Sequence, residues 1–204
     1  MSARGRFITL EGVDGAGKST HVGFIAEAIR AQGRHVIVTR EPGGTDLAER
    51  LREVILSQPM EPVAETLLLF AARADHVSRV IRPALAAGNW VVCDRFSDAS
   101  AAYQGAGKGV PAALIERLRE ATHPGLNPDR TLVFDCSYDV SRARLQASGK
   151  PLDRFEREDR AFFDRVRNAY LAASAAEPAR VRVIDAAAGL AAIRAAVAKA
   201  LEGL

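Results

Sequence analysis

Residues 7–20 read Phe-Ile-Thr-Leu-Glu-Gly-Val-Asp-Gly-Ala-Gly-Lys-Ser-Thr, and this stretch decides the fold. Its first five residues form a short apolar run, which is typical of a strand buried on both faces. Residues 12–19 match the pattern G-x-x-x-x-G-K-[ST], and a helical pattern begins at Lys18. A strand, a glycine-rich turn and a helix in this order predict a phosphate-binding loop, because backbone N–H groups and a helix N-terminus then face the phosphates.

This loop predicts specific roles for its residues. Lys18 is expected to reach the transferring phosphates, and the Ser19 hydroxyl is expected to bind Mg²⁺. Asp94 closes a later strand beside the loop and is suited to hold the same Mg²⁺ through water. The predicted ATP-binding residues are Gly12, Val13, Asp14, Gly15, Ala16, Gly17, Lys18, Ser19 and Thr20.

The rest of the chain alternates between two patterns. Short β-branched or aromatic runs predict strands at residues 7–11, 35–39, 90–94, 131–135 and 181–185. Helical patterns cover residues 18–32, 46–56, 63–87, 112–121, 138–147, 160–176 and 190–201. Strand–helix–strand alternation predicts an α/β fold of three layers, with about five parallel strands flanked by helices. One domain is expected over residues 1–204.

Composition narrows the class of protein. A chain of 204 residues that is 48% hydrophobic and 26% charged is typical of a soluble globular protein. Cys93 and Cys136 are too few for a disulfide framework or a zinc cluster. No apolar run approaches the ~20 residues that span a bilayer, and the N-terminus carries no secretory apolar region. A cytoplasmic location and no membrane partner are therefore expected.

The charge and aromatic content give no sign of a nucleic-acid partner. The net charge of +3 is not concentrated in a Lys/Arg tract, and aromatic content is 6%. These features give no stacking platform or basic track for nucleic acid, so no nucleic-acid partner is expected.

A phosphate-binding loop fits a small-molecule kinase, a GTPase switch or a DNA-dependent ATPase. The Asn-Lys-x-Asp motif that reads guanine is missing, and a DNA-dependent ATPase usually needs a longer chain. A kinase needs an acceptor pocket with its own anion clamp. Residues 39–45 and 94–96 supply candidates, since both segments leave strands at the same edge of the sheet.

Five motifs together resemble the thymidylate kinases, the nucleoside monophosphate kinases that phosphorylate dTMP. The motifs are Gly-Val-Asp-Gly-Ala-Gly-Lys-Ser-Thr (12–20), Arg-Glu-Pro-Gly-Gly-Thr (40–45), Asp-Arg-Phe (94–96), Ala-Tyr-Gln-Gly (102–105) and Leu-Asp-Arg-Phe-Glu (152–156). The resemblance runs from residue 7 to about residue 184. It implies the P-loop kinase fold, the reaction ATP + dTMP → ADP + dTDP with Mg²⁺, and a homodimer. The apolar stretches 67–69 and 77–85 are consistent with an interface.

The resemblance also implies an acceptor site. Arg95 and Arg52 look like the clamp on the dTMP phosphate, since guanidinium forks suit phosphate oxygens. Asp14 is similar to a carboxylate that receives the sugar 3′-hydroxyl. Further residues implied to contact the sugar or the base are Glu41, Pro42, Phe70, Arg73, Ser100, Tyr103 and Gln104. Phe70 is expected to stack on thymine, although relatives carry this aromatic residue where Leu69 stands here, so Leu69 remains the alternative.

The segment of about residues 144–158 is expected to be a mobile flap, or lid, because Gly149 and Pro151 break the preceding helix. The resemblance implies that a lid cation neutralises the transferring phosphoryl group. Arg144, Lys150 and Arg154 are the candidates, and with Lys18 and Arg95 they form the predicted catalytic set.

Two other functions stay open at this point. One is a kinase for another nucleoside monophosphate or for a deoxynucleoside. The other is a non-catalytic nucleotide-binding module, which would bind ATP without turnover and would leave the acceptor clamp unexplained.

Overall fold

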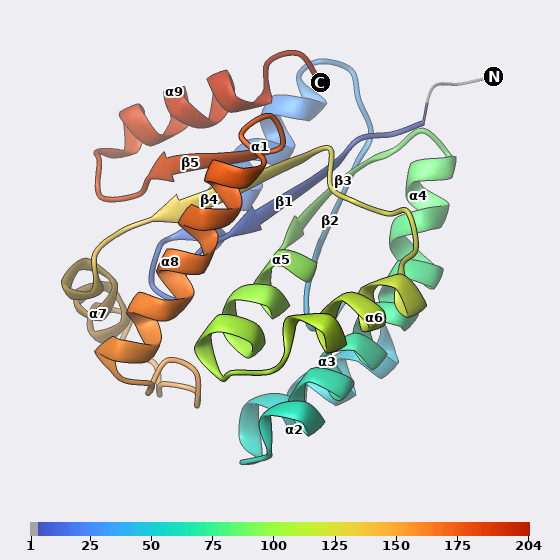
Figure 1. Cartoon of the computed structure of the whole chain (residues 1–204). Helices are drawn as coiled ribbons and strands as arrows, with labels where there is room; N and C mark the ends of the chain where they lie inside the picture. The colour runs from blue at the N-terminus through green and yellow to red at the C-terminus, as the bar shows by residue number, and fades with distance from the viewer. Residues whose placement is uncertain (1–3) are drawn as a thin grey trace.

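The computed structural model describes residues 4–204, and the first three residues of the predicted domain and N-terminus lie outside the described residues. Its centre is a five-stranded parallel sheet with the order β2-β3-β1-β4-β5, as the alternating pattern predicts (Figure 1). The strands are β1 (Phe7–Glu11), β2 (Val36–Arg40), β3 (Trp90–Asp94), β4 (Arg130–Asp135) and β5 (Val181–Asp185). The predicted strands differ from these by one residue at most.

Helices cover both faces of the sheet. Figure 1 shows α1 and α9 on one face and α4, α5 and α8 on the other. The α-helices are α1 (Lys18–Arg30), α2 (Asp46–Ser57), α3 (Pro62–His76), α4 (Arg82–Ala86), α5 (Ser97–Ser100), α6 (Ala112–Thr122), α7 (Tyr138–Ala147), α8 (Arg160–Ala176) and α9 (Leu190–Leu201). Two π-helical turns, η1 (Val77–Ile81) and η2 (Ala101–Gly107), continue α3 and α5. No helix of residues 4–204 has both the length and the apolar character that crossing a membrane requires.

The strand pattern explains the core. All five residues of β1 are buried, because this strand lies at the centre of the sheet between β3 and β4. The edge strands differ: Val38 in β2 and Val183 in β5 are more than two-fifths exposed. The prediction that a continuous apolar run is buried on both faces of the sheet is therefore right for the central strand β1 and wrong for the edge strands β2 and β5. Cys93 and Cys136 are both buried and unpaired.

Two helical predictions need correction. The pattern over residues 63–87 predicted one helix, but the structure divides it into α3, η1 and α4. Pro83 lies just after η1 and lacks the N–H that a regular α-helical turn would use, which explains the change in hydrogen bonding. The helical segment formed by α5 and η2 was not predicted, because Gly105 and Gly107 lower helix propensity there.

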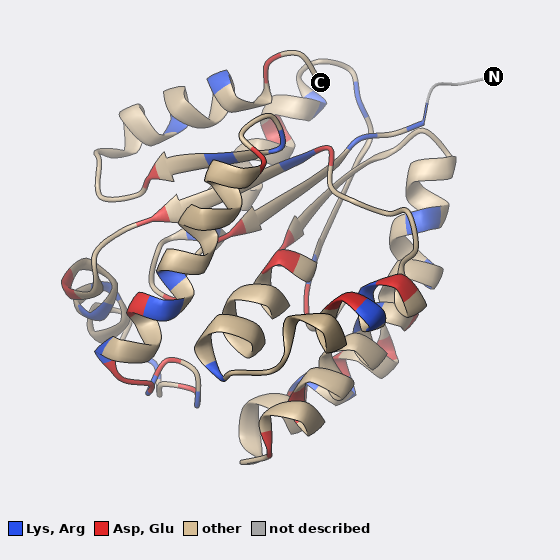
Figure 2. Ribbon diagram, in the orientation of Figure 1, with Lys and Arg blue, Asp and Glu red and all other residues tan. Residues whose placement is uncertain are grey.

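Carboxylates mark the functional edge of the sheet. Glu11, Asp94, Asp135 and Asp185 are the last residues of β1, β3, β4 and β5. Figure 2 shows acidic residues at these strand ends, next to the loops that leave the sheet. Because all strands are parallel, these ends share one edge, and ligands of open α/β sheets bind there.

Candidate active site

The loop of residues 12–17 joins β1 to α1 and turns its backbone inward. Gly12 and Gly15 have φ angles of 126° and 74°, which side chains with a Cβ rarely adopt. A Cβ on Gly12 would lie 2.3 Å from the Phe134 carbonyl oxygen, and one on Gly15 would lie 2.6 Å from the Ser141 carbonyl oxygen. Glycine is therefore required at both positions, and the loop takes the shape of a phosphate cradle at the α1 N-terminus.

Lys18 is the first residue of α1, and its side chain folds back over the cradle. Its Nζ donates hydrogen bonds to the carbonyl oxygens of Gly12 at 3.0 Å and Val13 at 2.9 Å. Burial, followed by the charge of Arg95, lowers the pKa of Lys18 to about 8. An anion in the cradle would offset both effects, which makes the ammonium suited to phosphate oxygens.

Ser19 and Asp94 form a small oxygen-rich site beside Lys18. The Ser19 hydroxyl donates to Asp94 Oδ2 at 3.1 Å. Asp94 Oδ1 is buried and has no hydrogen-bond partner within residues 4–204. The described residues hold no cluster of three or more His, Cys, Asp and Glu that could bind a metal. One hydroxyl and one unsatisfied carboxylate oxygen nevertheless fit Mg²⁺, which takes few protein ligands and completes its shell with phosphates and water.

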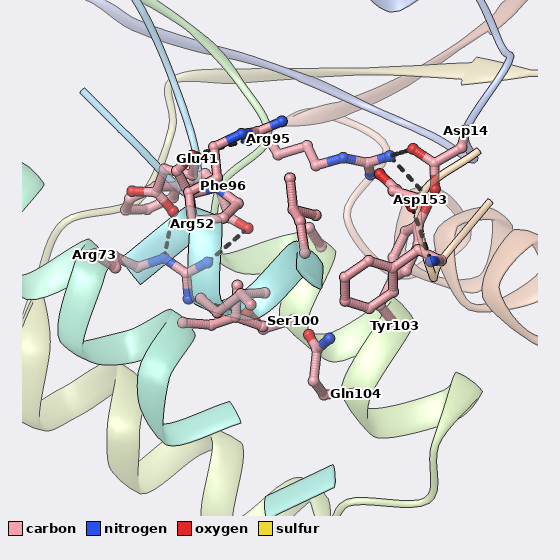
Figure 3. A pocket seen from close by; sticks show the side chains of 16 residues that line it. Asp14, Glu41, Arg52, Arg73, Arg95, Phe96, Ser100, Tyr103, Gln104 and Asp153 are labelled. Carbon is pink, nitrogen blue, oxygen red and sulfur yellow. Dashed lines mark hydrogen bonds and ion pairs between the residues drawn. The ribbon is translucent and has the colours of Figure 1, made fainter. Parts of the chain in front are cut away.

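Two cavities open at this edge. The loop cavity is lined by residues 14–21, by Asp94 and by residues of the lid and of the segment before α9. The inner cavity lies between the sheet edge, α2, α3 and η2, and Figure 3 shows the side chains that line it. The two cavities share five of their lining residues, namely Asp14, Glu41, Arg52, Arg95 and Asp153. The predicted clamp, Arg52 and Arg95, therefore lies on the same side of the molecule as Lys18.

Arg95 lies where the cavities meet. Its guanidinium contacts Asp14 at 2.5 Å (Figure 3). It also hydrogen-bonds the Tyr103 hydroxyl at 2.9 Å and the Gly12 carbonyl oxygen at 2.9 Å. Tyr103 also donates to Asp14 at 2.8 Å. Burial opposes ionisation of Asp14, but Arg95 and Lys18 outweigh it and lower the pKa of Asp14.

The backbone of Arg95 is held in a strained conformation. Its φ of 71° makes it the single non-glycine residue with a positive φ among the described residues. Such a conformation persists only when its surroundings fix it. The N–H of Arg95 donates to the Leu10 carbonyl at 2.9 Å, and the next N–H, of Phe96, donates to the Glu11 carboxylate at 2.7 Å.

Glu11 is a fully buried residue that the sequence interpretation missed. Besides Phe96, it accepts a hydrogen bond from the Tyr170 hydroxyl at 2.7 Å. Burial and the charge of Asp98 raise the pKa of Glu11 to about 7. Its place at the end of the predicted strand was visible in the sequence, but its partners are Phe96, just before α5, and Tyr170 on α8.

Arg73 and Glu41 form a second buried pair deeper in the inner cavity. Arg73 Nε donates to Glu41 Oε2 at 2.6 Å, and its other nitrogens donate to the Ser100 hydroxyl and to the Phe96 carbonyl, each at 3.1 Å. His76, which no motif singled out, contacts the other Glu41 oxygen at 3.0 Å. Burial disfavours the Glu41 charge, but Arg73 and His76 outweigh it and lower the pKa of Glu41. The sequence held one signal for His76: it lies three residues after Arg73, and this spacing places both side chains on one face of a helix.

Leu69 and Phe70 occupy different positions relative to the cavity wall. Leu69 lines the inner cavity, whereas Phe70 is 1% exposed and packs with Val110 and Ile115. This placement favours Leu69 over Phe70 as the residue that would cover the base, and contact of either residue with a base stays a prediction. One residue along α3 rotates the side chain by about 100°, from the cavity into the core.

The three candidate lid cations lie in different places. Arg144 reaches the loop cavity, where it donates to the carbonyl oxygens of Ala16 at 3.2 Å and Ala186 at 2.7 Å. The Lys150 side chain is exposed. Arg154 points the other way and forms an ion pair with Glu65 on α3. Of these three lid candidates, the structure therefore brings only Arg144 to the phosphate cradle.

Other predicted residues also line the two cavities. Arg52 donates to the Pro42 carbonyl at 2.9 Å and lines both cavities. The inner cavity is also lined by Pro42, Ser100, Tyr103 and Gln104. The phosphate cradle and the guanidinium-lined cavity lie next to each other at one edge of the sheet. This arrangement is typical of a P-loop kinase, which holds the donor phosphate and the acceptor side by side.

Comparison with known proteins identifies the family. A family model described as thymidylate kinase matches residues 10–197. The chain is 56% identical to the thymidylate kinase of Bordetella pertussis over 96% of this chain and 93% of that protein. It is 53% identical to the thymidylate kinase of Thiobacillus denitrificans over the full length of both. The crystal structure of thymidylate kinase from Ehrlichia chaffeensis, 32% identical, superposes with a TM-score of 0.79 and covers 98% of this chain and 99% of that one. The chain belongs to the thymidylate kinase family and is a kinase.

Proposed function

We propose that this enzyme transfers the γ-phosphoryl group of ATP to dTMP, forming ADP and dTDP. The observation that carries the proposal is the junction of the two cavities at Asp14 and Arg95. A donor phosphate in the cradle and an acceptor phosphate at Arg95 would lie next to each other there. The relatives named thymidylate kinase support dTMP as the acceptor.

On the donor side, the loop from Gly12 to Thr20 would hold the ATP phosphates through its backbone N–H groups, with Lys18 on the transferring end. Ser19 and Asp94 would hold Mg²⁺, which neutralises charge on the phosphate oxygens when bound. Their hydroxyl and unsatisfied carboxylate oxygen support this assignment.

On the acceptor side, Arg95 and Arg52 would grip the dTMP phosphate, and Asp14 would receive the sugar 3′-hydroxyl. Tyr103 would pack under the deoxyribose, with Glu41 and Pro42 near the sugar and the base. Arg73, Ser100 and Gln104 would hydrogen-bond the base, and Leu69 would cover it in place of Phe70.

The chemistry needs no covalent intermediate. An oxygen of the dTMP phosphate attacks the γ-phosphorus in line, and the protein supplies position and positive charge. Lys18, Arg95 and Arg144 would supply that charge at the reacting atoms, and Lys150 would join them if the lid closes further. Lid closure would exclude water, which would otherwise hydrolyse ATP.

A homodimer and a cytoplasmic location belong to the same proposal. Val54, Val63 and Leu67 on α2 and α3 are more than two-fifths exposed, and exposed apolar side chains of this kind would support a dimer. Residues 77–85 support it less than the sequence suggested, because Val77 and Ile81 are buried within the subunit. Two unpaired cysteines suit a reducing compartment.

A coupled assay for ADP formation tests the proposal. The purified protein is given Mg²⁺–ATP with dTMP, dUMP, dCMP, dGMP or thymidine in turn. We expect the highest kcat/KM with dTMP. Higher turnover with another acceptor would replace dTMP, and ATP binding without turnover of any acceptor would favour the non-catalytic module.

A further inference from the structure

Glu65 on α3 forms a buried polar centre that the proposed function does not use. Its carboxylate is 0% exposed. It accepts hydrogen bonds from Gln104 Nε2 at 2.7 Å and from Lys108 Nζ at 2.8 Å. Arg154 of the lid adds an ion pair through its Nη2 atom, whose contact with Glu65 does not have the geometry of a hydrogen bond. A buried carboxylate with two cations and one amide is a costly arrangement, so its consequences for the adjacent cavity matter.

The chemistry of Glu65 fixes the orientation of Gln104. A carboxylate can only accept hydrogen bonds, so the amide of Gln104 must turn its Nε2 toward Glu65. The carbonyl oxygen, Oε1, then points the opposite way. Gln104 lines the inner cavity. Within residues 4–204, Oε1 accepts no hydrogen bond, and it is not among the fully buried polar atoms that lack a partner, so it is accessible. Oε1 is therefore presented to the cavity as an acceptor.

Arg73 supplies the opposite polarity nearby. Its guanidinium can only donate, and it lines the same cavity beside Ser100 (Figure 3). The cavity thus offers a donor from Arg73 and an acceptor from Gln104. The edge of thymine presents a carbonyl oxygen next to a ring N–H, which matches this pair. Cytosine presents an amino group next to an unprotonated ring nitrogen, which opposes it.

We propose that Glu65 is a specificity-determining positioning residue: by holding the Gln104 amide with its oxygen in the cavity, it selects a pyrimidine that carries a ring N–H at position 3. The inference rests on the proposed function, since it takes a thymine nucleotide as acceptor. Glu65 does not touch the base, and its effect passes through Gln104.

The experiment compares dTMP with 5-methyl-dCMP, which has the same shape but carries an unprotonated ring nitrogen and an amino group in place of the ring N–H and the neighbouring carbonyl oxygen. Because the hydrogen bonds to Gln104 and Arg73 are both mismatched, the wild-type enzyme should prefer dTMP by about 100-fold or more in kcat/KM. Glu65→Gln lets the Gln104 amide take either orientation, so the preference should fall by about tenfold, mainly through the KM for the nucleotide, with the KM for ATP unchanged.

A double-mutant cycle separates this mechanism from others. Gln104→Ala should lower the preference by a similar factor and leave the part that is due to Arg73, and Glu65→Gln added to Gln104→Ala should change it no further, because the two residues act as one unit. Glu116→Gln removes a glutamate from α6 whose side chain is 69% exposed, and it should leave the preference at the wild-type value.

The contrary outcomes are distinct. If Glu65→Gln lowers kcat equally for both nucleotides and keeps the preference, Glu65 acts only as an anchor for Arg154 and the proposal is overturned. If the wild-type enzyme uses both nucleotides equally well, the proposal is overturned. This comparison needs no variant, so the proposal can be tested even if the Glu65 variant does not fold. If the wild-type enzyme does not phosphorylate dTMP at all, the proposed function fails, and the inference fails with it.

Discussion

Asp14 and Arg95 come from the loops that follow two neighbouring strands, and their side chains meet at 2.5 Å where the two cavities join. Each holds the other in place before any ligand arrives. A charge-assisted contact of this kind fixes geometry, which is what in-line phosphoryl transfer needs most. The pair also means that an incoming phosphate must share Arg95 with Asp14.

Arg95→Ala tests the acceptor clamp. We expect the Kd for dTMP to rise by roughly 30-fold or more, since hydrogen bonds to charged groups contribute about 1.5–3 kcal/mol and more than one is lost. The Kd for ATP should change by less than about threefold, because the cradle is made mostly of backbone N–H groups. Calorimetry with each nucleotide separately measures both values. Weaker ATP binding with unchanged dTMP binding would reverse the assignment.

Arg144→Ala and Lys150→Ala test the lid cations. Arg144 reaches the loop cavity and Lys150 is exposed, so we expect the larger loss of kcat from Arg144, about 100-fold or more. The dTMP affinity should be retained in both variants. Single-turnover rates measure the chemical step, and Arg157→Ala serves as a lid control because Arg157 bonds only within the lid, to the Leu152 carbonyl. Unchanged single-turnover rates in both variants would exclude a lid cation from catalysis.

Leu69 and Phe70 should give opposite phenotypes. Leu69→Ala removes part of the inner cavity wall, so the KM for dTMP should rise while stability changes little. Phe70→Ala opens a hole in the core and should cost about 3–5 kcal/mol of unfolding free energy. Urea unfolding and steady-state kinetics on both variants make the comparison. A larger KM effect from Phe70→Ala in a stable protein would restore Phe70 as the residue that faces the base.

Glu11 predicts a pH dependence of stability. Its pKa in the folded protein, about 7, exceeds its usual value of 4.5, so the folded state binds more protons than the unfolded state between these values. Its contribution to stability therefore decreases as pH rises from 4.5 to 7, by about 3 kcal/mol in total, and stays low above that. Glu11→Gln cannot titrate and should remove this dependence.

Unfolding by urea across this pH range measures the effect. The unfolding free energy of Glu11→Gln, relative to wild type, should increase as pH rises and level off above about 7. Glu53→Gln, at an exposed position on α2, is the matched control and should show a constant difference. A constant difference for Glu11→Gln as well would contradict the raised pKa.

The sequence predicted those features that depend on local pattern. The parallel sheet follows from strand alternation and is confirmed. The loop from Gly12 to Ser19 joins β1 to α1, as the residue order predicts, and phosphate binding there stays a prediction. The segment of α5 and η2 escaped because its glycines argue against a helix, while its packing against α8 favours one. Tertiary contacts outweigh propensity in such segments.

Residues that act through distant partners could not be predicted. Glu11, Glu65 and His76 carry no motif, and each acquires its position from side chains far away in the sequence. The position of Phe70 could not be predicted for a different reason. A shift of one residue on α3 exchanges cavity for core, and the motif did not determine which residue faces the cavity. Arg154 was predicted as a catalytic cation from its place in the lid, whereas its partner, Glu65, lies on α3.

The most direct test of the central claim is a binding competition with a compound that joins adenosine and thymidine through a polyphosphate bridge between their 5′-oxygens. If the cradle and the Arg95 clamp open into each other, one molecule of this compound should fill both cavities. Calorimetry should then show one compound bound per subunit and competition with both ATP and dTMP. Competition with ATP alone, while dTMP still binds with its normal affinity, would show that no phosphoryl group can pass between the two sites.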